Sequence, residues 1–456
     1  MYPLLRAVAG LALRWYYRDI QAEGLARIPR QRPLLLVVNH PNALVDALLI
    51  TWFVPRRVLI TAKATIFRNP LAAVLLRWMG VVPLRRASDE ALGPAASSPA
   101  RNKETFRAVH EALRSNGTVL IFPEGKSHDE PSLAPLKSGA ARMALYARET
   151  GNVADLAIVP IGLTFERKEA PRSRVLVQIG EPIFMNSWRA PIGAPPAEAL
   201  TAEIDARLRA VTLNYPTIDD ATRAIRLASL IAALFDDAPT IGARSLGVEM
   251  AIARRIDELS IRLQGADDAL RRQADQLVRR LDAVEHVAAN HGILVEDVGI
   301  EVDGGSAFWF VVRESWLVLL AGPLAIWGRI NHWLPFWAAR GIAMRSIDSA
   351  ADPAMRTLVA GTAFVALTYM AQTALVAALW GPAIAIGYLV SLPVAADINF
   401  SLSDRLRRAV HRARAFLRFR RDRELQHRLR DELRALREDV RAFDRALGSE
   451  LSVPTL

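Results

Sequence analysis

The sequence predicts an α/β domain, a mixed sheet flanked by helices, followed by a helical region, a transmembrane helical hairpin and a basic helical tail. Short apolar runs alternate with helical stretches up to about residue 182, which is typical of an α/β sheet. Farther on, the forty residues 357–396 carry no charge, whereas a helix needs about 20 apolar residues to cross a bilayer. After residue 401, arginine dominates.

Length and composition indicate a water-soluble part joined to a membrane part. A chain of 456 residues is too long for one compact core, so two or more domains are expected. Its hydrophobic content of 52% and mean hydropathy of +0.15 are high for a soluble protein, yet 23% of its residues are charged. We expect an amphipathic membrane-associating helix over 1–19, the α/β domain over 20–195, the helical region over 196–305, a membrane region over 306–400 with its hairpin near 357–396, and the tail over 401–456.

Net charge and cysteine content limit the binding partners and the kinds of site that are expected. The net charge is +11, and basic flanks beside apolar segments attract anionic membrane lipids. No nucleic-acid-binding motif is apparent, so nucleic acid is not expected as a partner. The absence of cysteine excludes disulfides, thiolate metal sites and a cysteine nucleophile. His286 and His291 are isolated in a helical region, and no metal site is expected there.

The N-terminal segment alternates apolar and basic groups at helical spacing over residues 2–18. We expect this segment to be retained and not to be a signal peptide, because Arg6 and Arg14 interrupt it and no clear small-residue cleavage site follows. Two placements fit this pattern equally well. The helix lies in the lipid headgroup region, or it packs on the α/β domain.

The elements of the α/β domain are predicted from apolar runs of strand length and the helical patterns between them. The expected strands are Leu34–Val38, Val58–Ala62, Gly80–Leu84, Thr118–Phe122, Leu156–Ile161 and Val175–Ile179. The expected helices are Val45–Trp52, Leu71–Met79, Arg101–Arg114 and Gly139–Arg148. The segment Ser88–Ala100, rich in Ala, Ser and Pro, is expected to be a surface loop.

The uncharged stretch is divided by Gly381-Pro382 into two spans. Arginines flank both sides, so the positive-inside rule puts both ends in the cytoplasm, as an even number of spans requires. We therefore expect an integral protein of the cell membrane whose α/β domain faces the cytoplasm. The run Ser315–Gly328 is shorter and contains Gly322-Pro323, which indicates an interfacial or re-entrant segment.

The tail has heptad-like apolar spacing from Leu429 to Leu447. This spacing is compatible with self-pairing, with packing on the earlier helices and with a position on the membrane.

A histidine and a carboxylate follow the first predicted strand. His40 lies two residues after Val38, and Asp46 comes one short turn onward. Asp46 can accept a hydrogen bond from one imidazole nitrogen and leave the other nitrogen to remove a proton from an alcohol. Such pairs also recur by chance, so the pair alone does not decide the function.

Three further motifs stand at strand ends. The turn Phe122-Pro-Glu-Gly125 and the residues after it offer groups for a polyol phosphate: Glu124, Gly125, Lys126, His128 and Lys137. The strand that leaves Gly80 ends in Arg85-Arg86, and the planar paired donors of arginine match phosphate oxygens. The third motif is the apolar run Val159-Pro-Ile-Gly162. Each motif also has a purely structural interpretation. A Pro-Glu-Gly sequence is often only a turn, arginines at a strand end are often solvated, and a strand with a proline often lies at a sheet edge. The order and spacing of the motifs together favour a functional site.

With His40 and Asp46, these motifs resemble the signature blocks of the glycerolipid acyltransferase superfamily (the phospholipid/glycerol acyltransferase domain) over about residues 20–185. The run Phe122–Asp129, continued over Pro135–Leu145, is similar to the fungal-type glycerol-3-phosphate/dihydroxyacetone-phosphate acyltransferase branch. The resemblance implies that residues 20–195 form a glycerolipid acyltransferase domain.

The resemblance implies transfer of a fatty acyl group from an acyl thioester to the hydroxyl of glycerol 3-phosphate or dihydroxyacetone phosphate in phospholipid biosynthesis. It makes His40 the general base and Asp46 the residue that orients it. It assigns Arg86 and Glu124 to the phosphate-bearing acceptor. The acyl donor would be a coenzyme A or carrier-protein thioester, and no cofactor is expected.

Two departures from the superfamily pattern bear on these roles. Five residues separate His40 from Asp46 where four are usual, a feature similar in the fungal-type branch. Lys126-Ser127 stands where Thr-Arg is usual, which can shift phosphate contacts to Lys126, His128 or Lys137. Lys63, after the strand Val58–Ala62, is another candidate.

Two alternative functions remain open. One is the same chemistry on 1-acylglycerol-3-phosphate (lysophosphatidate) or another lysolipid. The other is a non-catalytic lipid-binding membrane protein, against which the joint presence of His40 and Asp46 argues.

Overall fold

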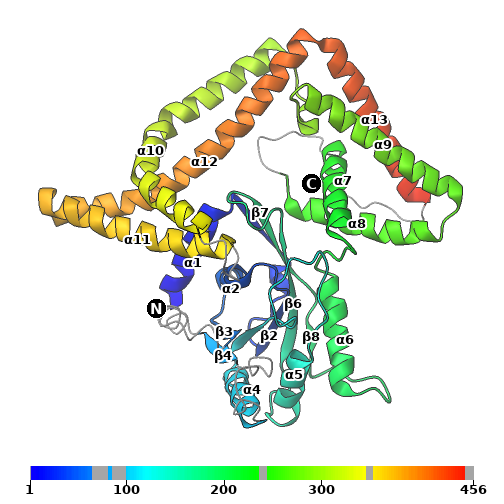
Figure 1. Ribbon diagram of the computed structural model, residues 1–456, viewed down its shortest axis with the longest axis vertical. Coiled ribbons are helices and arrows are strands. Elements are labelled where there is room, and N and C mark those ends of the chain that lie inside the picture. Colours follow the sequence, from blue (N-terminus) through cyan, green and yellow to red (C-terminus); the bar gives the residue numbers. More distant parts are fainter. Residues whose placement is uncertain (1, 64–80, 85–98, 236–243, 346–352, 447–456) are drawn as a thin grey trace. The chain divides into compact units, whose positions relative to one another are not determined.

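The computed structural model describes residues 2–63, 81–84, 99–235, 244–345 and 353–446 (Figure 1). The chain divides into two compact units. Unit 1 comprises Met1–Asn214 and Arg345–Val359, and unit 2 comprises Tyr215–Met344 and Ala360–Leu456. The predicted α/β domain lies in unit 1, and nearly all of the predicted hairpin lies in unit 2.

Within the described residues, unit 1 is built on one mixed eight-stranded sheet, and the predicted α/β fold is confirmed. The strands are β1 (Asp19–Glu23), β2 (Leu34–Val38), β3 (Val58–Lys63), β4 (Val82–Leu84), β5 (Thr118–Ile121), β6 (Ala157–Phe165), β7 (Arg174–Ile179) and β8 (Ile183–Phe184). Their order is β1-β7-β6-β2-β5-β3-β4, with β8 paired to β6. The pairs β6–β7 and β6–β8 are antiparallel, and the other pairs are parallel.

The flanking helices of unit 1 are α1 (Tyr2–Tyr16), α2 (Ala43–Phe53), α4 (Pro99–Arg114), α5 (Gly139–Glu149) and α6 (Pro196–Arg209). Three of the predicted helices correspond to α2, α4 and α5, whereas the predicted helix Leu71–Met79 lies outside the described residues. The predicted loop Ser88–Ala100 extends too far, because Pro99 and Ala100 already belong to α4. Proline suits the first turn of a helix, where its missing N–H would have no partner.

The core of the sheet follows the two-residue period of strand β2. Leu34, Leu36 and Val38 point into one hydrophobic cluster, and Leu35 and Val37 point into the cluster on the opposite face. All five side chains are fully buried. A central parallel strand covered on both faces needs an unbroken apolar run, which explains the sequence of β2.

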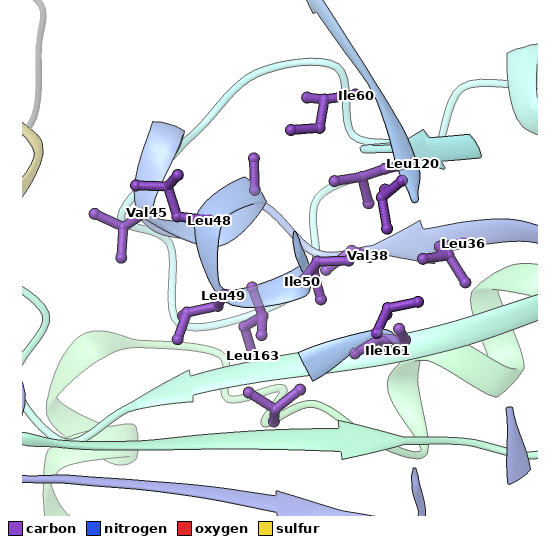
Figure 2. Packing of buried hydrophobic residues seen from close by; sticks show 14 of the residues in the cluster. Leu36, Val38, Val45, Leu48, Leu49, Ile50, Ile60, Leu120, Ile161 and Leu163 are labelled. Carbon is purple, nitrogen blue, oxygen red and sulfur yellow. The ribbon is translucent and has the colours of Figure 1, made fainter. Parts of the chain in front are cut away.

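The cluster on the first face is formed by the sheet and helix α2 (Figure 2). Val45, Leu48 and Leu49 of α2 lie over Val38 and Ile161 of the strands. Burial of one such aliphatic side chain contributes roughly 1.5–3 kcal/mol. This packing holds α2 in place. Because α2 carries Asp46, it also positions this candidate residue.

The N-terminal helix α1 packs on the α/β domain, the second of the two placements that fit its sequence. Leu5 and Leu13 are buried in the first-face cluster. At Gly10 an added Cβ would lie 2.6 Å from Nε1 of Trp52, so glycine allows α1 and α2 to approach closely. The outer face of α1 is also apolar, with Leu4 59% and Val8 37% exposed.

Unit 2 is entirely helical in the part that the structure describes. Its helices are α7 (Ile218–Leu234), α8 (Leu246–Gln264), α9 (Asp268–Asn290), the short η4 (Val295–Asp297), α10 (Gly304–Arg345), α11 (Pro353–Trp380), α12 (Pro382–Arg421) and α13 (Arg423–Ala446). The first residues of α11 and the last of α10 belong to unit 1. One hydrophobic core joins α7, α9, the end of α12 and α13.

The basic tail packs on the earlier helices, one of the three arrangements compatible with its heptad-like spacing. Leu429, Leu436 and Val440 of α13 are buried in the core that also holds residues of α7 and α9. Arg280 of α9 pairs with Glu432 at 2.7 Å. The apolar stripe of the tail is therefore used within unit 2.

Three helices in the described part of the chain are long and apolar enough to cross a membrane, over Gly304–Ala338, Thr357–Trp380 and Pro382–Arg421. The second and third are the arms of the predicted hairpin, and Gly381 separates them with a positive φ of 87°. The first contains the run Ser315–Gly328, which is part of the 42-residue helix α10.

Candidate active site

The candidate site lies where two neighbouring parallel strands end. Strands β2 and β5 are paired in parallel with Val37 opposite Ile121. Their carboxyl ends therefore meet at one edge of the sheet, where ligands bind in open α/β sheets. His40 follows β2 and Glu124 follows β5, which brings two motifs 84 residues apart into contact.

His40 and Asp46 form the pair that their spacing predicts. Nδ1 of His40 lies 3.0 Å from Oδ2 of Asp46. The Asp46 side chain is fully buried, whereas the His40 side chain is 17% exposed. An ionised carboxylate only accepts hydrogen bonds, so Nδ1 carries the proton and Nε2 is the basic nitrogen.

The loop between His40 and Asp46 accommodates the fifth intervening residue with a left-handed backbone. Ala43, the first residue of α2, has a φ of 43°, a conformation that costs an L-residue roughly 1–2 kcal/mol. Its N–H donates to Oγ of Ser127 at 3.2 Å. The N–H of Asn42 donates to Oδ2 of Asp46 at 2.8 Å. The carboxylate thus still reaches His40 across the longer loop.

Asn42 and Asn39 fix this loop to the rest of unit 1. The buried amide of Asn42 donates to the hydroxyl of Tyr17 at 3.2 Å and to the carbonyl of Lys168 at 3.3 Å. The Asn39 side chain makes two hydrogen bonds to the backbone of Leu163, at 3.0 and 2.7 Å. Sequence reasoning missed both asparagines, because their partners are distant in the chain.

Glu124 is 4% exposed, and both oxygens of its carboxylate contact groups within the protein. Oε1 accepts the backbone N–H of His40 at 2.8 Å. Oε2 accepts the N–H of Ala134 at 2.9 Å and also contacts Nε2 of His128. Glu124 therefore connects the Pro-Glu-Gly turn to the backbone of His40.

The imidazole of His128 is held at both nitrogens. Nδ1 accepts the backbone N–H of Glu130 at 3.2 Å, so the hydrogen at Nε2 is donated to Glu124. The backbone N–H of His128 also reaches the carbonyl of His40, at 3.4 Å. His128 thus helps to hold the turn against the His40 loop.

The His40 ring is oriented by stacking as well as by Asp46. Its centroid lies 3.8 Å from that of Phe122, with an angle of 14° between the planes. Stacking on one face and a hydrogen bond at Nδ1 leave the ring little rotational freedom.

Two predicted lysines with exposed side chains lie at the Pro-Glu-Gly turn, Lys126 directly after it in the chain and Lys137 packed against it. Lys126 follows Gly125, which has a positive φ of 82°. An added Cβ at Gly125 would lie 2.8 Å from Nζ of Lys137, so glycine lets the ammonium lie against the turn. The backbone N–H of Lys137 donates to the carbonyl of Pro123 at 2.9 Å.

A third lysine, Lys168, was not predicted. Its Nζ donates to the carbonyl of Pro41 at 3.2 Å and pairs with Asp129. No motif marked it, because the loop after β6 carries no strand-end signature. Of the other predicted cations, Arg86 lies outside the described residues, and Lys63 is the last residue of β3.

Metal ligands do not cluster in the described ranges of the chain: no group of three or more His, Cys, Asp or Glu side chains there could hold an ion. The site thus consists of a buried acid, an oriented imidazole, a buried glutamate at the turn and exposed lysines. This set can abstract a proton beside an anionic group.

Comparison with known proteins relates the α/β domain to a family model and to several enzymes. The family model described as Acyltransferase matches residues 19–164. Glycerol-3-phosphate O-acyltransferase 2 of Saccharomyces cerevisiae is 40% identical over 122 residues, 26% of this chain and 16% of that protein. Glycerol-3-phosphate O-acyltransferase 1 of the same yeast is 41% identical over 78 residues, 17% of this chain and 10% of that protein.

A plant relative matches over a longer stretch. The 1-acyl-sn-glycerol-3-phosphate acyltransferase of Cocos nucifera is 32% identical over 189 residues, 40% of this chain and 55% of that protein. In all three cases the matched part is less than two thirds of the relative's own length. The two yeast relatives agree with the resemblance to the fungal-type branch.

Proposed function

Because residues 19–164 match the Acyltransferase family model, we propose that this chain transfers a fatty acyl group from an acyl thioester to a hydroxyl of glycerol 3-phosphate or dihydroxyacetone phosphate. The observation that carries the proposal is the 3.0 Å contact between Nδ1 of His40 and the buried carboxylate of Asp46. It fixes the tautomer in which Nε2 can take a proton.

In the proposed reaction, Nε2 of His40 removes the proton of the acceptor hydroxyl as its oxygen attacks the thioester carbonyl. A C–O bond forms, the C–S bond breaks, and the thiolate leaves with the proton that His40 carried. Asp46 stabilises the imidazolium that exists between these steps. A thioester is already activated, so the reaction needs no covalent intermediate on the enzyme.

The acceptor phosphate is proposed to bind the exposed cations of the site. Lys126 follows the Pro-Glu-Gly turn, the ammonium of Lys137 lies against it, and Arg86 is the cation that the family resemblance adds. Glu124 and His128 have a different part in this proposal. Their polar atoms bond within the protein, so they position the His40 backbone and the turn instead of holding phosphate.

The apolar helices and the positive net charge support a membrane location. We propose that the protein is integral to the cell membrane, with the acyltransferase domain on the cytoplasmic face, where acyl-coenzyme A and acyl-carrier protein occur. Anionic lipids are the expected membrane partners and nucleic acid is not. No cofactor is required.

A second candidate acceptor is 1-acyl-sn-glycerol 3-phosphate. The similarity to the coconut enzyme, which covers 55% of that protein, favours it. Both acceptors offer a hydroxyl and a phosphate, so the same base and cations would serve. The two proposals differ only in whether the acceptor already carries an acyl chain.

The test is an acceptor panel with the full chain in lipid nanodiscs. Purified protein is given one acyl-coenzyme A and, in turn, glycerol 3-phosphate, dihydroxyacetone phosphate and 1-acyl-sn-glycerol 3-phosphate. We expect the highest kcat/KM with one of the first two. A preference for the third would move the assignment to the second candidate. Absence of transfer to all three, with both acyl-coenzyme A and acyl-carrier protein, would contradict the proposed function.

A further inference from the structure

The three apolar helices α10, α11 and α12 cannot all cross the membrane if the two units fold as described. The reason is connectivity: each end of each apolar segment is fixed to a folded core. The positions of these anchors along the chain determine how many crossings are allowed.

The first anchor is the junction of the units. Asn214 belongs to unit 1, where its Oδ1 accepts the N–H of Leu133 at 3.1 Å. The next residue, Tyr215, belongs to unit 2, where its hydroxyl donates to the carbonyl of Ala253 at 2.6 Å. No length of chain lies between these residues, so both units are on the same face of a bilayer.

The second pair of anchors encloses α10. Val302, two residues before α10, is buried in the core of unit 2, and its carbonyl accepts a hydrogen bond from Arg423. Beyond α10, the segment Arg345–Val359 belongs to unit 1, and its Leu358 is buried in the first-face cluster. Both ends of α10 therefore return to the face that carries the units, and α10 makes no net crossing.

The third pair of anchors encloses the hairpin. It starts at Leu358, and it ends where Ala415 and Phe419, both fully buried, join the core of unit 2. Helices α11 and α12 thus cross together or not at all. Length alone would not separate α12 from α10, since their uncharged stretches, 382–396 and 315–328, hold fifteen and fourteen residues. Connectivity makes the distinction.

Contacts between α10 and α12 give the depth of α10. Glu314 binds Arg405 through two hydrogen bonds of 2.8 Å, and farther along Asn331 accepts the hydroxyl of Tyr388 at 2.6 Å. The partner residue moves back along α12 toward the hairpin tip at Gly381 as α10 advances. At 1.5 Å per residue, Tyr388 lies roughly 25 Å along α12 from Arg405. Helix α10 thus runs down the hairpin and does not stay at one level.

The turning point coincides with Pro335. Proline removes the hydrogen bond to the carbonyl of residue 331 and bends the helix there, and α10 is bent along its length in Figure 1. His332 is 2% exposed, with Nδ1 at 2.7 Å from the carbonyl of Gly328 and Nε2 at 2.6 Å from the Tyr369 hydroxyl. These groups satisfy one another, as polar groups in hydrocarbon must.

We propose that α10 is a re-entrant membrane helix and that α11 and α12 form the transmembrane hairpin. Helix α10 enters the bilayer beside α12, turns near Asn331 and Pro335, and leaves on the face that carries both units. Its exposed apolar side chains, such as Leu319 and Ile330, contact lipid acyl chains.

The absence of native cysteine allows a direct test with single-cysteine variants of the full chain in sealed vesicles of phosphatidylcholine and phosphatidylglycerol. Ile192→Cys, fully exposed in unit 1, is the reference for the face of the units. A membrane-impermeant maleimide should label Ser306→Cys and Gly341→Cys, near the two ends of α10, from that face. It should label Trp380→Cys, at the hairpin tip, from the opposite face.

Depth measurements distinguish a re-entrant helix from one that lies flat. Nitroxides at Leu319→Cys and Ile330→Cys are compared by their accessibility to oxygen and to a nickel chelate. The two sites are eleven residues apart, so a descending limb places Ile330 deeper by up to about 16 Å. The pair Leu367→Cys and Leu379→Cys in α11 is the matched control for a crossing helix.

Three outcomes would overturn the proposal. Labelling of Gly341→Cys from the face opposite to Ser306→Cys would mean that α10 crosses. Equal depths at Leu319→Cys and Ile330→Cys would mean that α10 lies flat. Labelling of Trp380→Cys from the same face as Ile192→Cys would mean that the hairpin does not cross.

Discussion

Two histidines, one at the carboxyl edge of the sheet and one among the apolar helices, show how the surroundings of the proposed general base, His40, differ from those of His332. Both have Nδ1 beside a fixed acceptor, at 3.0 Å in His40 and 2.7 Å in His332. Nε2 of His332 is taken by the Tyr369 hydroxyl, and its side chain is buried. His40 is partly exposed, and its acceptor is a carboxylate, which can stabilise an imidazolium.

The difference lies in the surroundings and not in the residue type. A neutral carbonyl and a hydroxyl satisfy a neutral imidazole, which is the stable form where water is absent. The buried carboxylate of Asp46 and the open Nε2 instead suit the general-base role that we propose for His40. Burial alone therefore does not make a catalytic histidine.

Asp46→Asn removes the charge that distinguishes the two sites. The amide retains an oxygen for Nδ1 but no longer stabilises the imidazolium. We expect kcat/KM to fall by roughly 10²–10⁴, comparable to the whole contribution of a general base. Steady-state assays in nanodiscs measure this, with Asp155→Asn at the surface as the matched control. A loss below fivefold would assign Asp46 a packing role only.

Arg86→Ala separates acceptor binding from proton transfer. A charge-assisted hydrogen bond contributes about 1.5–3 kcal/mol, so KM for the phosphorylated acceptor should rise roughly tenfold to a hundredfold. KM for the thioester should change far less. Arg86→Lys should recover part of the loss, because one ammonium cannot replace paired donors. A selective rise in the thioester KM would instead place Arg86 at the donor.

His332→Phe tests the structural histidine. The substitution keeps an aromatic ring but leaves the Tyr369 hydroxyl and the Gly328 carbonyl without their partner. We expect a loss of roughly 1–3 kcal/mol in the free energy of unfolding. The kcat per folded molecule should stay within twofold of wild type. Denaturant titration in detergent and an activity assay of the same sample measure both quantities. A large fall in kcat without destabilisation would make His332 part of the reaction.

Asp297 extends the contrast to a buried acid of unit 2. Burial, followed by the neighbouring Glu296, raises its pKa to about 6, against the lowering influence of Arg412 and Arg244. A raised pKa means that its contribution to stability is full below the unfolded value near 4 and is lost as the pH rises through about 6. Asp297→Asn should reduce this fall in unfolding free energy between pH 4 and about 7. Unchanged pH dependence would contradict the assignment.

Features that depend on residues close together in the chain could be predicted from the sequence. The strand β2 and the helix α2 follow from short apolar patterns, and the His40–Asp46 pair follows from spacing along six residues. β1 was missed because its sequence, Asp19–Glu23, is polar and only its backbone pairing with β7 makes it a strand.

Features that depend on distant residues were not predictable. The resemblance assigned Glu124 to the acceptor, but its contact with the backbone of His40 requires β2 and β5 to be neighbours. In the same way, Lys168 becomes part of the site only through the loop after β6. The continuity of α10 was hidden because Pro323 and Pro335 lie inside it.

Acyl transfer by His40→Ala is the most direct test of the proposal that His40 is the general base. The variant deletes the proton acceptor but little packing, so the protein should fold, remain in the membrane fraction and lose roughly 10²–10⁴ of its kcat/KM. His286→Ala, an exposed histidine of unit 2, is the matched control and should keep full activity. Residual transfer by His40→Ala should rise with pH, as solvent hydroxide replaces the base. Near-normal turnover by well-folded His40→Ala would contradict the role of His40 as the general base.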